Sequence, residues 1–444
     1  MTDVSSKAAK QGAFVRGELL PMAPPPHFSV GVFGWMRRHL FSSPLNVLLT
    51  LLGAYVIWIV FKGLIEWGFV DAVWRGADRN ACLTSVAGHP VGACWAFVHA
   101  KLGQFTYGLY PASEIWRVNL CYVIGFVGLV GLMVPSIPFK AANLVFMFCL
   151  YPLLALILLS GGHFFAMSPG AWVKLGLSMV LLLAVLLFWA ERTKSVALGS
   201  IVRLWGLFAV ALAILLSVLQ TDWGLMPVRT DLWGGLTVTL VIAATGIVLS
   251  LPVGIVLALG RRSRMPIVRT LSVLFIEFWR GVPLITVLFM ASVMLPLFLP
   301  EGVDFDKLLR CLVCIALFWG AYMAEVVRGG LQALNRGQYE GGHALGFGYW
   351  QLMRLIILPQ ALKVVIPGIT NTIVALFKDT SLVTIVGLFD LLGIIQASFS
   401  DPKWITPASW ATAYGFAAMI YWLFCFAMSR YSVFMERRLN VHNK

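Results

Sequence analysis

The chain has 444 residues, of which 60% are hydrophobic and only 12% are charged, whereas about 25% of the residues of a soluble domain are charged. This composition cannot cover a folded surface with polar groups, so it excludes a soluble globular fold and predicts a protein embedded in lipid. No strand-like alternation repeats along the chain, and an all-α, polytopic membrane protein is therefore expected. The net charge of +14 is scattered over many loops, which excludes a nucleic-acid-binding face.

The apolar segments set the expected order of helices. Residues 1–44 are basic and rich in proline, and we predict a mostly disordered cytoplasmic tail with Arg37 and Arg38 at the lipid headgroups. At about 20 apolar residues per crossing, ten candidate spans follow. They cover residues 45–61, 115–134, 141–160, 172–190, 201–219, 232–259, 270–299, 308–327, 362–395 and 408–428. The ninth segment is too long for one crossing and should contain a break.

The chain divides near residues 221–230. Residues 45–220 form an N-terminal transmembrane region with a long outward loop at 62–114. Residues 230–432 form the second region, and a cytoplasmic tail is expected at 433–444. Only the second region carries many charges within or beside its spans, and such charges usually face a partner or a pathway because lipid solvates them poorly. We therefore place the function in residues 230–432.

The short loops indicate the orientation. Basic residues gather in every second short loop, and cytoplasmic loops hold the excess of Lys and Arg. Both termini and the loop at residues 338–360 are therefore expected in the cytoplasm. On the opposite side, Cys82 and Cys94 lie in the long outward loop. They are either a disulfide, if that loop faces an oxidising periplasm, or two free thiols.

Residues 338–360 form a polar island punctuated by glycine. A short amphipathic segment reaches Leu345, and an apolar run then leads into Pro359. Glycine adopts positive φ without steric strain, so Gly346 can end the first helix in the left-handed conformation and redirect the chain. The pattern predicts a helix outside the bilayer, a sharp turn and a return into the bilayer.

The order of Glu340, Gly346 and the later Ile356-x-Leu358-Pro359 resembles the loop signature of ABC-importer permeases. In that family the loop forms a coupling helix that docks into a cleft of the ATPase subunit. The usual Glu-Ala-Ala opening is Glu340-Gly341-Gly342 here, with the spacing unchanged. The resemblance implies an ATPase-coupling loop made of Glu340, Gly341, Gly342, His343, Ala344 and Gly346.

The whole second region resembles permeases of the polar amino-acid (histidine/glutamine/glutamate) branch of ABC importers. The matching elements are residues 234–240, 277–284, 325–330 and 376–382, followed by Asp390-Leu391. In the outward loop, residues 92–96 and 108–111 resemble the larger permease subunit of general L-amino acid importers. The resemblance implies a C-terminal type I ABC-importer permease core.

Two charged groups within the second region have alternative interpretations. Glu325 and Arg328, like Glu277 and Arg280, are spaced to pair on one helix face. Such pairs are either structural or transmit movement of the coupling loop.

Lys378, Asp379, Thr380 and Ser381 interrupt an apolar run. Adjacent opposite charges do not share one face of a regular helix, so a helix break is expected. This segment either lines the translocation path, where it offers a cation and acceptors to a zwitterionic amino acid, or forms a structural charge network.

Together these features predict a permease subunit of an ATP-driven importer of L-amino acids in a bacterial inner membrane. No Gly-x-x-x-x-Gly-Lys-Ser/Thr motif occurs, so ATP and Mg²⁺ are expected on a partner ATPase and no catalysis or cofactor is expected in this subunit. The family implies three partners: a second homologous permease, an ATP-binding subunit dimer and a periplasmic amino-acid-binding protein. The alternative is a self-contained secondary amino-acid transporter driven by an ion gradient.

Overall fold

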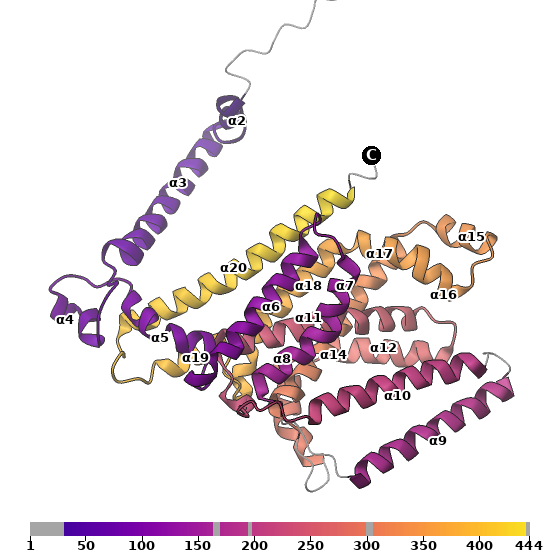
Figure 1. Ribbon diagram of the computed structural model, residues 1–444. Helices are drawn as coiled ribbons and strands as arrows, with labels where there is room; N and C mark the ends of the chain where they lie inside the picture. Colours follow the sequence, from indigo (N-terminus) through magenta and orange to yellow (C-terminus); the bar gives the residue numbers. More distant parts are fainter. Residues whose placement is uncertain (1–30, 163–168, 194–197, 299–304, 441–444) are drawn as a thin grey trace, which may run out of the picture. The chain divides into compact units, whose positions relative to one another are not determined.

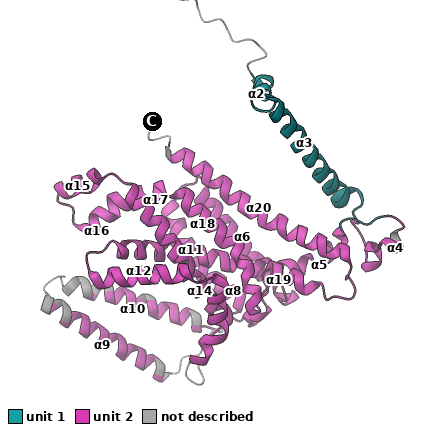
Figure 2. Ribbon diagram, turned by 180° about the vertical axis from the view of Figure 1, so that it is seen from behind, with its two compact units in different colours: residues 1–72, 90–93 teal, residues 73–89, 94–444 magenta. Residues whose placement is uncertain are grey.

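The computed structural model describes residues 31–162, 169–193, 198–298 and 305–440. The chain divides into two compact units (Figure 2): residues 1–72 with 90–93, and residues 73–89 with 94–444.

Unit 1 contains α2 (Gly31–His39) and α3 (Pro44–Ile65), which continues into the π-helical turn η2 (Glu66–Val70). Ser43 caps α3 by accepting a hydrogen bond from the Asn46 N–H. The prediction of a mostly disordered tail is wrong for residues 31–39, which form α2. Arg37, Arg38 and His39 occupy its last turn, where positive charge interacts favourably with the helix dipole. Residues 1–30 lie outside the described part of the chain.

The first part of unit 2 contains both short elements and long helices (Figure 1). These are η3 (Arg79–Cys82), α4 (Thr84–Ala87), α5 (Trp95–Tyr107), η4 (Ala112–Glu114), α6 (Ile115–Met133), α7 (Lys140–Val145), η5 (Phe146–Leu150), α8 (Tyr151–Ser160), α9 (Pro169–Thr193) and α10 (Leu198–Gln220). α7, η5 and α8 together make one span.

The second part of unit 2 is the longer run of helices. It contains η6 (Thr230–Leu232), α11 (Gly235–Arg261), α12 (Pro266–Gly281), α13 (Leu284–Phe289), η7 (Met290–Met294), η8 (Leu295–Phe298), α14 (Lys307–Ala333), α15 (Arg336–Ala344), α16 (Tyr349–Leu352), η9 (Met353–Ile357), α17 (Leu358–Val364), α18 (Ile366–Asp379), η10 (Thr380–Val386), α19 (Leu391–Ser398) and α20 (Pro407–Asn440). Figure 1 shows α15 and α16 at one end of the unit, with α5 and α19 at the other.

The predicted all-α membrane fold is confirmed. Within the described residues, seven helical segments are long and apolar enough to cross a bilayer, and a bent helix pair is an eighth candidate. α9 and α10 contain shorter apolar stretches at Trp172–Phe188 and Trp205–Val218. Each of the ten predicted spans therefore coincides with helical structure.

Two of these spans are broken. α12 and α13 meet at an angle of 101°, because Pro283 lacks a backbone donor and disfavours helical geometry at Val282. The predicted break in the ninth span is confirmed, since α18 ends at Asp379 and a 3₁₀ helix follows.

The glycines of α6 face the neighbouring span. Gly125, Gly128 and Gly131 face the side chains of Tyr151, Met147 and Asn143, which would overlap with any Cβ placed there. The Asn143 amide donates to the Gly128 carbonyl at 2.9 Å, and the Tyr151 hydroxyl donates to the Cys121 carbonyl at 3.1 Å. Small residues thus let α6 approach the α7–η5–α8 span closely.

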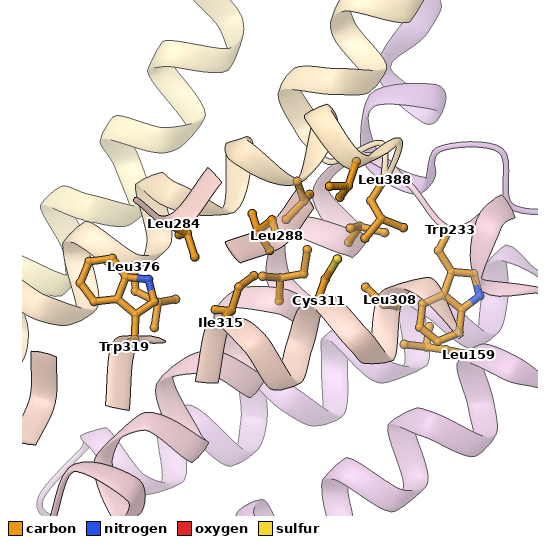
Figure 3. Packing of buried hydrophobic residues seen from close by; sticks show 14 of the residues in the cluster. Leu159, Trp233, Leu284, Leu288, Leu308, Cys311, Ile315, Trp319, Leu376 and Leu388 are labelled. Carbon is orange, nitrogen blue, oxygen red and sulfur yellow. The ribbon is translucent and has the colours of Figure 1, made fainter. Parts of the chain in front are cut away.

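One buried core joins the two sequence regions of unit 2. Val118 and Cys121 of α6 and Leu159 of α8 belong to the same cluster as residues of α11, α13 and α14. Figure 3 shows Leu159 beside Trp233, and Leu288 beside Cys311 and Ile315. The N-terminal helices of unit 2 therefore share apolar packing with the permease-like region.

The C-terminal helix is longer than expected. α20 has 34 residues and reaches Asn440, so the predicted tail at residues 433–444 is helical up to residue 440. A span is limited by its apolar residues, but the helix continues because its backbone hydrogen bonds also form outside lipid. Residues 163–168, 194–197, 299–304 and 441–444 also lie outside the described residues.

Candidate functional site

The predicted coupling loop contains an independent helix with complete caps. Asn335 accepts a hydrogen bond from the Gly337 N–H at the start of α15. At its end, Gly346 has φ of 81°, its N–H donates to the His343 carbonyl, and the Phe347 N–H donates to the Gly342 carbonyl. This is the Schellman arrangement, which satisfies the last carbonyls of a helix. The predicted left-handed turn at Gly346 is confirmed.

The two glycines that follow Glu340 differ in their surroundings. Gly342 is buried, and a Cβ there would overlap with the Leu352 side chain. Gly341 is exposed, with no atom within 4 Å of an added Cβ. Gly342 is therefore required by close packing, whereas nothing in the structure explains why Gly341 is a glycine.

One side of the loop is buried against other helices, and the other side is exposed. Leu352 and Ile357 are fully buried in a cluster with residues of α11, α12 and α14. In contrast, the side chains of Leu345 and Trp350 are 77% and 72% exposed. Exposed large apolar side chains such as these indicate a surface for a protein partner or for a membrane.

The two predicted pairs, Glu325 with Arg328 and Glu277 with Arg280, come together with Arg261 in one group. This group of five residues is here called the Glu325 cluster. Glu325 accepts hydrogen bonds from Arg328 at 2.6 and 2.9 Å and from Arg261 at 2.8 Å. Arg261 also donates to Glu277 at 2.9 Å, and Arg280 lies 3.8 Å from Glu325. The predicted pair between Glu325 and Arg328 is present, but Glu277 pairs with Arg261 instead of Arg280.

The segment from Lys378 to Ser381 lies at the end of α18. Lys378 is exposed, Asp379 is partly buried and Thr380 is fully buried. Thr380 and Ser381 donate to the carbonyls of Phe377 and Lys378, which ends the helix. Among the described residues, no ion pair joins Lys378 or Asp379 to another side chain. The two charges therefore lie in different environments and do not neutralise one another.

A buried carboxylate lies eleven residues beyond Asp379. Asp390 is 0% exposed and accepts four hydrogen bonds, from the Thr384 and Tyr421 hydroxyls at 2.6 and 2.9 Å and from the N–H groups of Gly393 and Leu392 at 3.0 and 3.2 Å. It caps α19 and joins it to η10 and α20. The sequence singled out Asp390 as part of the family element Asp390-Leu391 and did not indicate this set of donors.

The opposite end of unit 2 is joined by contacts from the outward loop. Cys82 and Cys94 form a disulfide, with Cα atoms 5.8 Å apart. The Cys94 N–H donates to the Thr412 hydroxyl of α20 at 2.7 Å. The Lys101 ammonium lies 2.6 Å from the Asp401 carboxylate. Its hydrogen bond, with a further one from the Lys403 N–H, holds the pKa of Asp401 below its usual value.

Sequence reasoning also missed a buried arginine. Arg117 of α6 is 0% exposed, lies 3.0 Å from Glu114 and donates to the Met226 carbonyl at 3.0 and 3.1 Å. Met226 belongs to the connection between α10 and α11. An arginine in the first turn of an apolar span was the available signal, because such a charge needs a partner.

Comparisons with known proteins identify the family of this chain. The model of the family described as "Binding-protein-dependent transport system inner membrane component" matches residues 250–441. The chain is 46% identical over 420 residues to the inner membrane amino-acid ABC transporter permease protein YhdY of Escherichia coli (strain K12), covering 95% of this chain and 96% of that protein.

Two further relatives extend the comparison. The glutamate/glutamine/aspartate/asparagine transport system permease protein BztC of Rhodobacter capsulatus is 44% identical over 441 residues, covering 96% of this chain and 98% of that protein. The probable amino-acid ABC transporter permease protein YckA of Bacillus subtilis is 30% identical over 207 residues, 46% of this chain and 87% of that protein. Since two similarities cover nearly the whole chain, it belongs to the amino-acid ABC transporter permeases, within the family of binding-protein-dependent transport system inner membrane components.

Proposed function

We propose that this protein is the transmembrane permease subunit of an ATP-driven ABC importer for L-amino acids. The observation that carries the proposal is α15, an exposed helix with the family's loop signature, which stands on a buried cluster and presents Leu345 beside its C-terminal cap. An ATPase that contacts α15 would act on α11, α12 and α14 through this cluster.

The mechanism follows from the two ends of unit 2. A dimer of ATP-binding subunits, which carry ATP and Mg²⁺, closes against the α15 face and moves it. A periplasmic amino-acid-binding protein delivers substrate at the opposite end, and a second homologous permease completes the path through the bacterial inner membrane. Each ligand must favour one conformation differentially to drive the cycle. Both chain termini and α15 lie in the cytoplasm in this arrangement.

The substrate class is supported by a relative. BztC is named as a permease for glutamate, glutamine, aspartate and asparagine. Amino acids with a carboxylate or amide side chain are therefore the first substrates to test.

The co-purification of partners tests the proposal. Gly341→Trp adds an indole at an exposed position of α15 where an added Cβ meets no atom within 4 Å, and Gly176→Trp does the same on α9. The complex is isolated in mild detergent from native membranes. An ATPase and a second permease should accompany the wild type and Gly176→Trp, but much less ATPase should accompany Gly341→Trp. A wild-type protein that comes out alone would favour the ion-gradient transporter.

We further propose that Lys378, Asp379, Thr380 and Ser381 line the translocation path. Lys378 is exposed and Asp379 is partly buried. No ion pair joins them in the described part of the chain, and this supports the role. Lys378→Met should abolish most uptake of ¹⁴C-labelled L-glutamate and L-glutamine while the complex still assembles. Unimpaired uptake by that variant would contradict the proposal.

A further inference from the structure

Three elements meet at one backbone carbonyl beside α15. Leu331 lies in the last turn of α14, whose final carbonyls have no partner within the helix. Its carbonyl accepts hydrogen bonds from the Arg262 guanidinium at 3.1 Å and from the Tyr339 hydroxyl at 2.9 Å. Arg262 follows the last residue of α11, and Tyr339 belongs to α15.

Arg262 and Tyr339 also contact each other. Nη1 of Arg262 lies 3.0 Å from the Tyr339 hydroxyl oxygen, and the guanidinium carbon lies 5.4 Å from the centre of the Tyr339 ring. The three contacts close a triangle between α11, α14 and α15. Movement of α15 must therefore break these contacts or carry the end of α11 with it.

Arg261, the residue before Arg262, contacts α12 and α14. Arg261 donates to both Glu277 of α12 and Glu325 of α14. Since adjacent Cα atoms are about 3.8 Å apart, Arg261 and Arg262 cannot move independently. The end of α11 thus connects α15 on one side with the Glu325 cluster on the other.

This connection is accessible from outside. Arg262, Leu331 and Tyr339 line an open hollow of about 420 Å³ that also includes Glu340. A protein that covers the outer face of α15 would therefore lie against the same residues.

We propose that Arg262 is a positioning residue for coupling, which transfers displacement of α15 to α11 and, through Arg261, to the Glu325 cluster. The inference rests on the proposed function, because it requires an ATPase that acts on α15. Both hydrogen bonds of Arg262 come from Nη1, so a lysine at this position keeps the charge and a donor nitrogen but lacks the planar guanidinium that lies against the Tyr339 ring. The expected signature is hydrolysis without transport, not loss of assembly.

The test uses the complete importer in proteoliposomes, with ATP hydrolysis and uptake of ¹⁴C-labelled L-glutamate and L-glutamine measured together. Uptake per ATP hydrolysed should fall about fivefold or more in Arg262→Ala, which corresponds to a typical coupling between sites. Arg262→Lys should restore only part of this ratio. Arg264→Ala is the matched control, since Arg264 is exposed and makes no hydrogen bond or ion pair among the described residues.

Tyr339→Phe removes only a hydroxyl. This variant keeps the inference testable if Arg262→Ala no longer binds the ATPase. It should lower the same ratio, and Arg262→Ala combined with Tyr339→Phe should be no worse than Arg262→Ala alone. If variants that retain the ATPase show the same uptake per ATP hydrolysed as Arg264→Ala, the inference is overturned and the proposed function stands. A wild-type preparation without an ATPase would overturn the proposed function, and the inference with it.

Discussion

The two ends of unit 2 are held together by different kinds of contact. At the α15 end, long charged side chains that are partly exposed connect the helices, with Arg261 26% and Glu277 53% exposed. At the α19 end, the buried Asp390 has all its hydrogen bonds inside the protein, beside the partly exposed pair of Lys101 and Asp401. Glycines there allow backbone contact: Gly108 and Gly234 meet so closely that neither has room for a side chain.

The difference has an energetic meaning. Exposed ion pairs contribute about 0 to 1 kcal/mol each, so the contacts at the α15 end can be exchanged at small cost. A buried, hydrogen-bonded carboxylate cannot be exchanged in this way, because every donor left unsatisfied costs about 1 to 3 kcal/mol. One end is therefore suited to rearrangement on contact with a partner, and the other to holding helix positions.

The largest effect is expected at Asp390. Asp390→Ala leaves four donors without their acceptor, and the free energy of unfolding should fall by at least about 3 kcal/mol. The measurement is thermal unfolding in detergent. Its readout is maleimide labelling of the thiols of Cys121 and Cys311, which are buried in the folded protein. Asp231→Ala is the control, because Asp231 is 59% exposed and pairs with the exposed Arg229. Equal effects of the two substitutions would remove the contrast between the ends.

Two smaller effects are expected at adjacent glycines of α15, and they should have opposite signs. Gly342→Ala forces Leu352 to move and should destabilise the docking of α15 by about 1 to 3 kcal/mol. Gly341→Ala meets open space and should stabilise the helix by up to about 1 kcal/mol. Hydrogen exchange of the α15 amides, read by mass spectrometry, measures both. Changes of the same sign would contradict the structure.

The smallest effect is the pH dependence of the pair between Lys101 and Asp401. The pKa of Asp401 is lowered from its usual value of 3.8, chiefly by the hydrogen bond from Lys101. A lowered folded-state pKa means that the stabilisation is present above pH 3.8 and is lost as the pH falls through the lowered pKa.

The loss should be below about 1 kcal/mol, since the pair is partly exposed. Thermal unfolding measured between about pH 6 and about pH 3 should show this loss in the wild type. Lys403→Met keeps the backbone donor and should show the same loss. Lys101→Met should show less of it. An identical pH profile in Lys101→Met would show that the pair contributes nothing.

The local structure of the predicted coupling loop was largely predictable from the sequence because its signals are local. Gly346 ends α15, and the spacing from Glu340 to Pro359 identified the family, which the whole-chain similarities confirm. The pair between Glu325 and Arg328 was equally local, since it lies within one turn of one helix.

The contacts that join distant elements were not predictable. The donors to Asp390 come from η10, α19 and α20, so no spacing along the chain reveals them. Arg261 reaches Glu325 across 64 positions. The difference between Gly341 and Gly342 depends on where Leu352 lies after folding. Likewise, apolarity predicted the span of α20 but not its end, because a helix does not stop where the lipid does.

The length of α20 has a geometric consequence. At about 1.5 Å per residue its 34 residues extend about 51 Å, whereas the hydrocarbon layer is about 30 Å thick. Even with a tilt of about 40°, the helix rises about 39 Å along the membrane normal. Arg437 and Arg438 occupy its last turn, so the surplus length lies at that end. We therefore expect the last turns of α20 to project beyond the hydrocarbon layer, and a fluorophore attached there would report the height and tilt of the helix above the headgroups.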